Sequence, residues 1–208
     1  MSAYYIPTGP GEAEFTEKRS RFLGHVRMVE SEDEARAFIA DMKKKYYDAR
    51  HNCWCYSIKD GPERYSDDGE PQGSAGIPML EVLRRQNVTN AVCVVTRYFG
   101  GVLLGTGGLL RAYTKSTADA LEAAGISAVR RWVETELPCT YAQLERMKQE
   151  AASAGGIVED VEYGAGVTLR VMVPEEQSED FAARIFDRTA GSVTVRVTGE
   201  SFRAVPLR

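Results

Sequence analysis

The sequence lacks several features that mark common functional classes. It has only two histidines and four cysteines, and the cysteines form neither a Cys-x-x-Cys motif nor the spacing of a disulfide framework. No apolar run approaches the roughly 20 residues of a membrane-spanning helix. The first residues carry no basic region followed by an apolar region, as a secretory signal would. We therefore expect a protein of the reducing cytoplasm without a membrane partner.

The chain also lacks the excess of positive charge that a protein would need to bind nucleic acid over most of its surface. Its 208 residues carry a net charge of −4 and are 43% hydrophobic, which is typical of a globular protein. Residues 1–133 hold 18 Lys and Arg against 17 Asp and Glu, a net of +1. Residues 134–208 hold 8 against 13, a net of −5. Any nucleic-acid surface should therefore be local and belong to the first part.

The strongest chemical signal is a glycine-rich stretch between an expected strand and an expected helix. Residues 91–95 form a short apolar run typical of a buried strand, and residues 109–124 have helical spacing. Between them lie five glycines: Gly100, Gly101, Gly105, Gly107 and Gly108. Such a turn lets the backbone approach a ligand closely, and a helix N-terminus favours anions. With Arg97 before the turn and Arg111 after it, the stretch predicts a phosphate or carboxylate site.

The spacing of these glycines excludes two familiar phosphate-binding motifs. Gly105 is followed by Thr106-Gly107 rather than by the Lys-Ser/Thr of a P-loop, and Leu110 stands where a dinucleotide fingerprint has its third glycine. We expect Gly107 to need a positive φ that a side chain would disfavour. The alternative is a turn that only packs a helix closely onto a sheet.

Residues 98–113, Tyr-Phe-Gly-Gly-Val-Leu-Leu-Gly-Thr-Gly-Gly-Leu-Leu-Arg-Ala-Tyr, closely resemble the signature of the YigZ/IMPACT family. Three further stretches resemble the same family: residues 18–22, 50–56 and 66–76. The resemblance implies an α+β domain like domain IV of elongation factor G, followed by a ferredoxin-like domain. It also implies an association with translation. The eukaryotic relatives, which share only the first domain, regulate translation through partner proteins.

Two other groups of residues are candidates for chemistry. One face of an expected strand carries His51, Cys53 and Cys55, which suggests a Cys–His nucleophile pair. However, same-face neighbours on a strand lie roughly 7 Å apart, beyond hydrogen-bond reach, so we expect the cysteines to be structural. His51 is a candidate polar contact at the edge of a site. The carboxylates of Asp67, Asp68 and Glu70 are weak candidates for a metal. They could instead cap the following helix or pair with Arg97 and Arg111.

The second part of the chain has a clear order of expected elements. A strand, a helix, two strands, a helix and a final strand follow one another from residue 134 to the end, and this βαββαβ order is the ferredoxin-like arrangement. We therefore predict two domains, residues 1–133 and 134–208, in the α+β class. Nothing catalytic stands out in the second.

The favoured function is a non-enzymatic RNA- or ribosome-associated protein that modulates translation and needs no cofactor. Its phosphate site would combine the five glycines with charged, polar and aromatic side chains, the aromatic ones stacking on unpaired bases. These side chains are those of Arg21, His51, Arg97, Tyr98, Thr106, Arg111 and Tyr113. The alternatives are an enzyme acting on a nucleotide or phosphorylated small molecule in the same pocket, and a protein-interaction module.

Overall fold

The computed structural model describes residues 4–207, which form two compact units. The first unit comprises residues 4–129 and 204–207, and the second comprises residues 130–203. Both units combine helices with antiparallel sheets, so the predicted α+β class is confirmed. No helix within residues 4–207 has the length and apolar character needed to cross a membrane.

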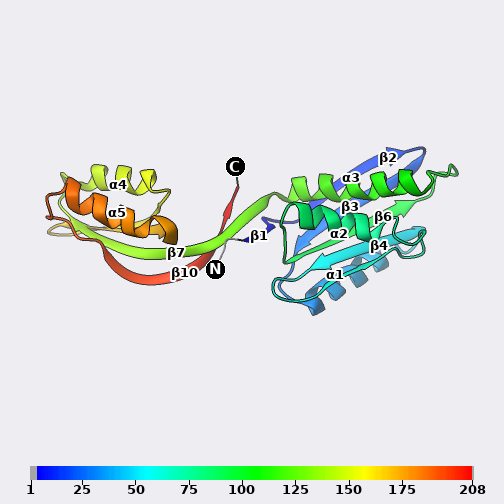
Figure 1. Ribbon diagram of the computed structural model, residues 1–208, viewed down its shortest axis with the longest axis horizontal. Coiled ribbons are helices and arrows are strands. Elements are labelled where there is room, and N and C mark those ends of the chain that lie inside the picture. The colour runs from blue at the N-terminus through cyan, green and yellow to red at the C-terminus, as the bar shows by residue number, and fades with distance from the viewer. Residues whose placement is uncertain (1–3, 208) are drawn as a thin grey trace. The chain divides into compact units, whose positions relative to one another are not determined.

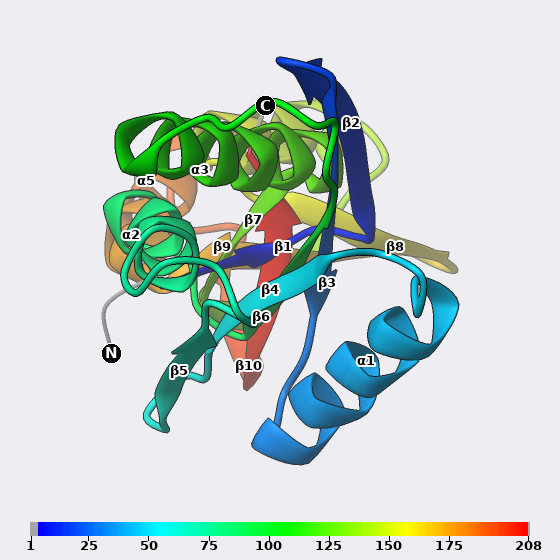
Figure 2. The ribbon, with the colours of Figure 1, turned by 90° about the vertical axis from the view of Figure 1, so that its right-hand side faces the viewer.

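The first unit is built on a five-stranded antiparallel sheet with helices on both faces (Figures 1 and 2). Helix α1 (Glu32–Lys45) covers one face, and helices α2 (Gly76–Arg85) and α3 (Thr106–Ala124) cover the other. The strands follow one another in the order β2 (Gly11–Glu17), β3 (Ser20–Met28), β6 (Ala91–Tyr98), β4 (His51–Ser57) and β5 (Glu63–Ser66).

The central strand β6 separates two hydrophobic clusters because its side chains alternate between the faces. Cys93 and Val95 pack with α2 and α3, whereas Val92 and Val94 pack with α1. Arg97 therefore points to the face of α2 and α3, and Tyr98 points to the other face. In β4, His51 lies opposite Arg97 in the register, so both side chains reach the same end of the same face.

Helix α3 lies unusually close to strands β2 and β3, and two glycines make this possible. A Cβ added at Gly11 would lie 2.1 Å from the carbonyl oxygen of Ala120, and one at Gly24 would lie 2.5 Å from that of Ser116. The helix begins at Thr106 rather than near Leu109, because Gly107 and Gly108 adopt helical conformation in its first turn.

Strand β1 (Tyr4–Pro7) was not predicted from the sequence. It pairs with residues 126–129.

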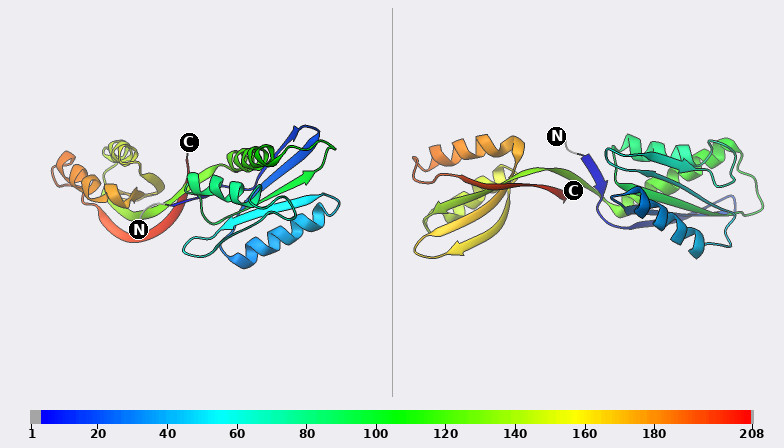
Figure 3. Two further views of the ribbon diagram at one scale, coloured as in Figure 1. Left: turned by 45° about the vertical axis from the view of Figure 1, so that its right-hand side comes forward. Right: turned by 90° about the horizontal axis from the view of Figure 1, so that it is seen from below.

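The second unit has the predicted βαββαβ order (Figure 3). Its sheet follows the order β10, β7, β9, β8, and the side chains of its two helices fill a core with those of β7 and β9. The elements are β7 (Ile126–Cys139), α4 (Leu144–Ser153), β8 (Ile157–Tyr163), β9 (Val167–Pro174), α5 (Glu175–Arg188) and β10 (Arg196–Pro206). Strand β7 starts well before residue 134, so the expected domain boundary falls inside a continuous strand.

We predict that residues 134–208 fold on their own. In β7, the residues from Glu134 to Cys139 all pair with β9, so this fragment keeps the strand register that its core requires. Thermal unfolding of the fragment, followed by circular dichroism, should be cooperative. A fragment of residues 130–208 serves as the comparison. If only the longer fragment unfolds cooperatively, the domain boundary lies before residue 134.

Candidate functional site

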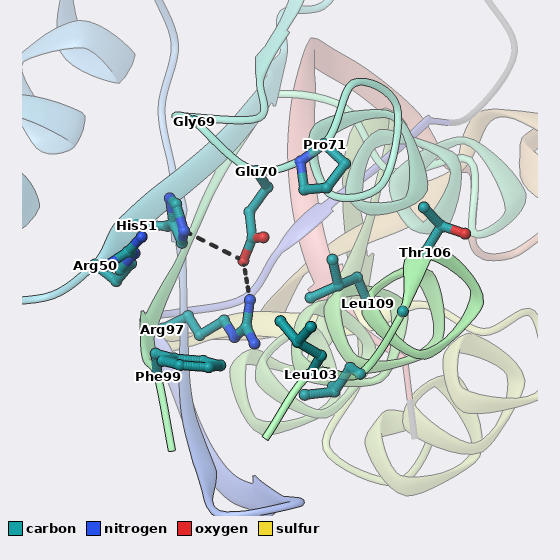
Figure 4. Close-up of a pocket in the computed structure, with 12 residues that line it drawn as sticks. Arg50, His51, Gly69, Glu70, Pro71, Arg97, Phe99, Leu103, Thr106 and Leu109 are labelled. Carbon is teal, nitrogen blue, oxygen red and sulfur yellow. Dashed lines mark hydrogen bonds and ion pairs between the residues drawn. The ribbon is translucent and has the colours of Figure 1, made fainter. Parts of the chain in front are cut away.

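A pocket of about 420 Å³ opens in the first unit where β4 begins, β6 ends and α3 starts. Four parts of the chain supply its walls: the start of β4, the loop after β5, the end of β6, and the glycine turn (residues 100–108) with the first residues of α3 (Figure 4). The lining residues are Arg50, His51, Gly69, Glu70, Pro71, Arg97, Phe99, Leu103, Leu104, Gly105, Thr106 and Leu109.

A buried carboxylate is the centre of the polar part of this pocket. Oε1 of Glu70 accepts hydrogen bonds from Nη1 of Arg97 at 2.6 Å and from the hydroxyl of Tyr113 at 2.8 Å. Nε2 of His51 lies 3.8 Å from the same oxygen (Figure 4). Burial, together with the neighbouring Cys53 thiol and Glu70 carboxylate, raises the pKa of Tyr113, so its hydroxyl remains a donor.

Arg97 makes further contacts through Nη2 and through the faces of two aromatic rings, whereas its buried Nε has no hydrogen-bond partner among the described residues. Its Nη2 donates to Oγ of Ser20 at 3.3 Å, and its guanidinium lies 5.6 and 5.5 Å from the ring centroids of Phe22 and Phe99. Because Glu70 neutralises its charge, Arg97 contributes little net positive potential to the pocket. The remaining positive character comes from the exposed Arg50 and from the N-terminus of α3.

The three carboxylates after β5 have separate structural roles. Oδ1 of Asp67 accepts from the backbone of Ala75 and Gly76 at 3.1 and 2.8 Å, and so caps the start of α2. Asp68 accepts from Nζ of Lys43 at 2.6 Å and from the backbone N–H of Asn52. Among residues 4–207 no three His, Cys, Asp or Glu side chains are placed to share a metal ion. The structure thus shows Asp67 capping a helix, and Asp68 and Glu70 in ion pairs with Lys43 and Arg97.

The five glycines of the turn serve different purposes. A Cβ at Gly100 would lie 2.0 Å from the backbone of Arg19, and one at Gly108 would lie 2.9 Å from Cβ of Leu104, so both are required by packing. Gly101 and Gly105 have φ of 84° and 72°, which disfavour other residues.

Gly107 does not have the positive φ expected from the sequence, because it lies within α3. A Cβ there would meet only Nη1 of Arg111, at an ordinary 3.6 Å. Neither packing nor backbone conformation therefore requires a glycine at this position, and only the end of the Arg111 side chain lies near it.

The structure brings some of the predicted site residues together and places others elsewhere. His51, Arg97, Gly105 and Thr106 line the pocket, and the side chain of Arg111 lies over the first turn of α3. Tyr113 is fully buried beneath the pocket, so it cannot stack on a base as expected.

Two predicted residues lie on the other side of the sheet. The hydroxyl of Tyr98 donates to Asp48 at 2.8 Å, and Arg21 forms a bidentate ion pair with Glu14. Alternation along β6 and β3 turns both side chains away from Arg97. Arg21 and Tyr98 therefore do not belong to this pocket.

Ser20 and Arg50 reach or support the site without having been singled out from the sequence, and Phe99, an aromatic residue beside the glycine turn, also lines the pocket. Each is adjacent in sequence to a residue that was named: Ser20 to Arg21, Arg50 to His51, and Phe99 to Tyr98. A period of two along β3 and β6, applied from Arg97 and its register partner Phe22, would have selected Ser20 and Phe99, but the same period along β4 selects His51 and not Arg50.

The cysteines near the site are buried and protonated. Cys53 and Cys55 are fully shielded from solvent, and this burial raises the pKa of both thiols. Sγ of Cys53 also donates a hydrogen bond to the carbonyl oxygen of Asp67 at 2.9 Å. Such thiols lack the thiolate character of a nucleophile.

Comparison with known proteins finds similarity along almost the whole chain. Residues 18–121 match the family described as "Impact N-terminal domain", and residues 137–192 match "Domain of unknown function (DUF1949)". The chain is 34% identical to "IMPACT family member YvyE" of Bacillus subtilis, over 94% of this chain and 91% of that protein. It is 34% identical to "IMPACT family member YigZ" of Escherichia coli, over 93% and 97%.

The similarity extends to a solved structure and, over part of the chain, to a eukaryotic protein. A crystal structure described as that of a hypothetical protein is 33% identical and has a TM-score of 0.59, covering 96% of this chain and 98% of that one. "Protein IMPACT homolog" of Dictyostelium discoideum is 38% identical over 48% of this chain but only 30% of that protein.

We predict that Cys55→Ser lowers the free energy of unfolding more than Cys53→Ser does. A serine at position 53 keeps a donor for the carbonyl of Asp67, whereas one at position 55 buries a hydroxyl without that partner, at a cost of about 1–3 kcal/mol. Urea unfolding measures both. In the folded wild-type protein, neither thiol should react rapidly with a thiol reagent, and rapid reaction at pH 7 would restore the nucleophile interpretation.

We also predict that Glu70→Ala destabilises the protein by about 3–5 kcal/mol, because it leaves the charge of Arg97 buried without a partner. Urea unfolding tests this change. Glu14→Ala, which removes the exposed partner of Arg21, is the matched control and should have little effect. Equal losses in the two variants would show that the buried pair has no special role.

Proposed function

The chain belongs to the IMPACT family, and we propose that it is a non-enzymatic RNA-binding protein that acts with the translation machinery. In this proposal the glycine turn and the first turn of α3 hold a phosphate group of RNA. The first unit supplies the site, and the second, more acidic part of the chain stays away from the RNA.

The observation that carries the proposal is the open backbone at the start of α3. Gly105 is the N-cap of this helix and offers no side chain to its first N–H groups. No atom lies within 4 Å of a Cβ built at Gly101 or Gly105. At position 107 the packing would also allow a residue with a side chain, so packing does not explain the glycine there. Uncapped N–H groups that a ligand can approach are the feature by which helix N-termini bind phosphate.

Positive side chains surround this open backbone. Arg50 and Arg111 are exposed, and Arg111 extends over the first turn of α3. Phe99, which is 43% exposed, and Leu103, which is 81% exposed, offer an apolar surface beside them. Phosphate contacts supply most of the affinity in such sites, and an exposed aromatic ring stacks on bases of any sequence.

A second candidate function is an enzyme that acts on a nucleotide or phosphorylated small molecule in the same pocket. The observation in its favour is the buried Glu70 beside His51, since a carboxylate near an imidazole can move protons. The dependence of affinity on salt separates the two functions. RNA binding through several phosphates falls steeply with salt, whereas binding of a small ligand in a pocket changes less.

Two substitutions in α3 test the phosphate site. Gly107→Ala should weaken RNA binding because its methyl group covers the approach to the N–H groups, while the melting temperature stays equal or rises because alanine favours a helix. Arg111→Ala should weaken binding by about 1.5–3 kcal/mol, as expected for a hydrogen bond to a charged group. The measurement is the affinity for a labelled single-stranded RNA at two salt concentrations.

Lys115→Ala is the matched control, because it removes one positive charge from the same helix at a residue already paired with Asp119. Its RNA affinity should equal that of the wild type. Wild-type affinity in both folded test variants would show that the turn is only structural.

A further inference from the structure

The pocket contains a hydrogen-bond acceptor that the phosphate site does not use. Oε1 of Glu70 accepts hydrogen bonds from Arg97 and Tyr113, but no residue that the structure describes donates a hydrogen bond to Oε2. Figure 4 shows this second oxygen turned away from His51 and Arg97. Glu70 is only 8% exposed, and it lines the pocket. Oε2 is not among the side-chain atoms that are both shielded from solvent and without a hydrogen-bond partner, so it is accessible from the pocket and free to accept a hydrogen bond from a ligand.

The chemistry of Glu70 restricts what that ligand group can be. Glu70 forms an ion pair with Arg97, and a carboxylate in an ion pair only accepts hydrogen bonds. The complementary group must be a hydroxyl or an amine. Tyr113 and Arg97 also fix the orientation of the carboxylate, so it recognises a donor at one position rather than attracting cations in general.

The remaining walls of the pocket identify the rest of the ligand. Gly105 and Thr106 at the start of α3 fit a phosphate, and Phe99, Leu103 and Leu109 fit a flat apolar ring. A volume of about 420 Å³ lies at the lower end of the range for small-molecule pockets, which suits one nucleotide rather than a length of strand. A phosphate, a hydroxyl donor and a base occur together within a single ribonucleotide.

We propose that Oε2 of Glu70 accepts a hydrogen bond from the ribose 2′-hydroxyl of one bound nucleotide, so that the pocket distinguishes RNA from DNA. This inference rests on the proposed phosphate site and names its specificity. The 2′-hydroxyl is the group by which a protein tells the two nucleic acids apart, and acidic side chains bind ribose hydroxyls in other nucleotide sites.

The test compares ligands on the full-length wild-type protein, so that it does not depend on a substitution that could impair folding. Fluorescence anisotropy gives the affinities of labelled oligo(A), its 2′-O-methyl form and oligo(dA) at one salt concentration. Oligo(A) should bind about tenfold or more tightly than either of the others, since each lacks the 2′-hydroxyl donor.

Glu70→Gln should reduce this ratio towards one. Arg97 retains the amide oxygen of the new side chain, which leaves its NH₂ group, a donor, facing the pocket. Asp119→Asn makes the same change at a carboxylate on α3 that is paired with Lys115, and it should keep the wild-type ratio. Circular dichroism confirms that each variant is folded.

The outcomes separate the inference from the proposed function. Equal wild-type affinity for oligo(A) and oligo(dA) overturns the role of Glu70 but leaves phosphate binding intact. Absence of binding to both oligonucleotides and to AMP overturns the proposed function and the inference with it. Tighter binding of AMP than of dAMP, without oligonucleotide binding, supports ribose recognition and assigns it to a free nucleotide instead of RNA.

Discussion

The ion pair between Glu70 and Arg97 joins parts of the first unit that are far apart in the sequence. Glu70 comes from the loop after β5, Arg97 from the end of the central strand, and Tyr113, which donates to the same oxygen, from α3. Two charges buried in this way are tolerated only when their hydrogen bonds are well formed. The loop, the sheet and the helix that make the pocket are therefore held in one arrangement by one carboxylate.

This pair also changes the electrostatic character of the site. Taken by itself, Arg97 is a positive charge beside a glycine turn; in the folded protein its charge is largely balanced by Glu70. In the proposed phosphate site, the attraction for an anion therefore depends on Arg50, Arg111 and the uncapped start of α3. In the proposed site, Oε2 of Glu70 is an acceptor in the same pocket for a second part of the ligand.

Close packing and ligand access place different demands on the same glycine-rich sequence. Gly100 and Gly108 allow close contact with Arg19 and Leu104, as Gly11 and Gly24 do elsewhere beneath α3. A Cβ at Gly107 would meet only the end of the Arg111 side chain, at an ordinary contact distance of 3.6 Å. A turn that served packing alone would not need a glycine there, because alanine would stabilise the helix.

The sequence by itself determined the α+β class, the βαββαβ order, the glycine turn between a buried strand and a helix, and the family, because these follow from local periodicity and contiguous motifs. Only the tertiary structure decided which side chains share the pocket. Register and alternation place His51 beside Arg97 and turn Tyr98 and Arg21 away, and burial removes Tyr113 from any ligand. The choice of Glu70 over Asp67 and Asp68 as the partner of Arg97 depends on contacts between residues 27 positions apart, which no local pattern specifies.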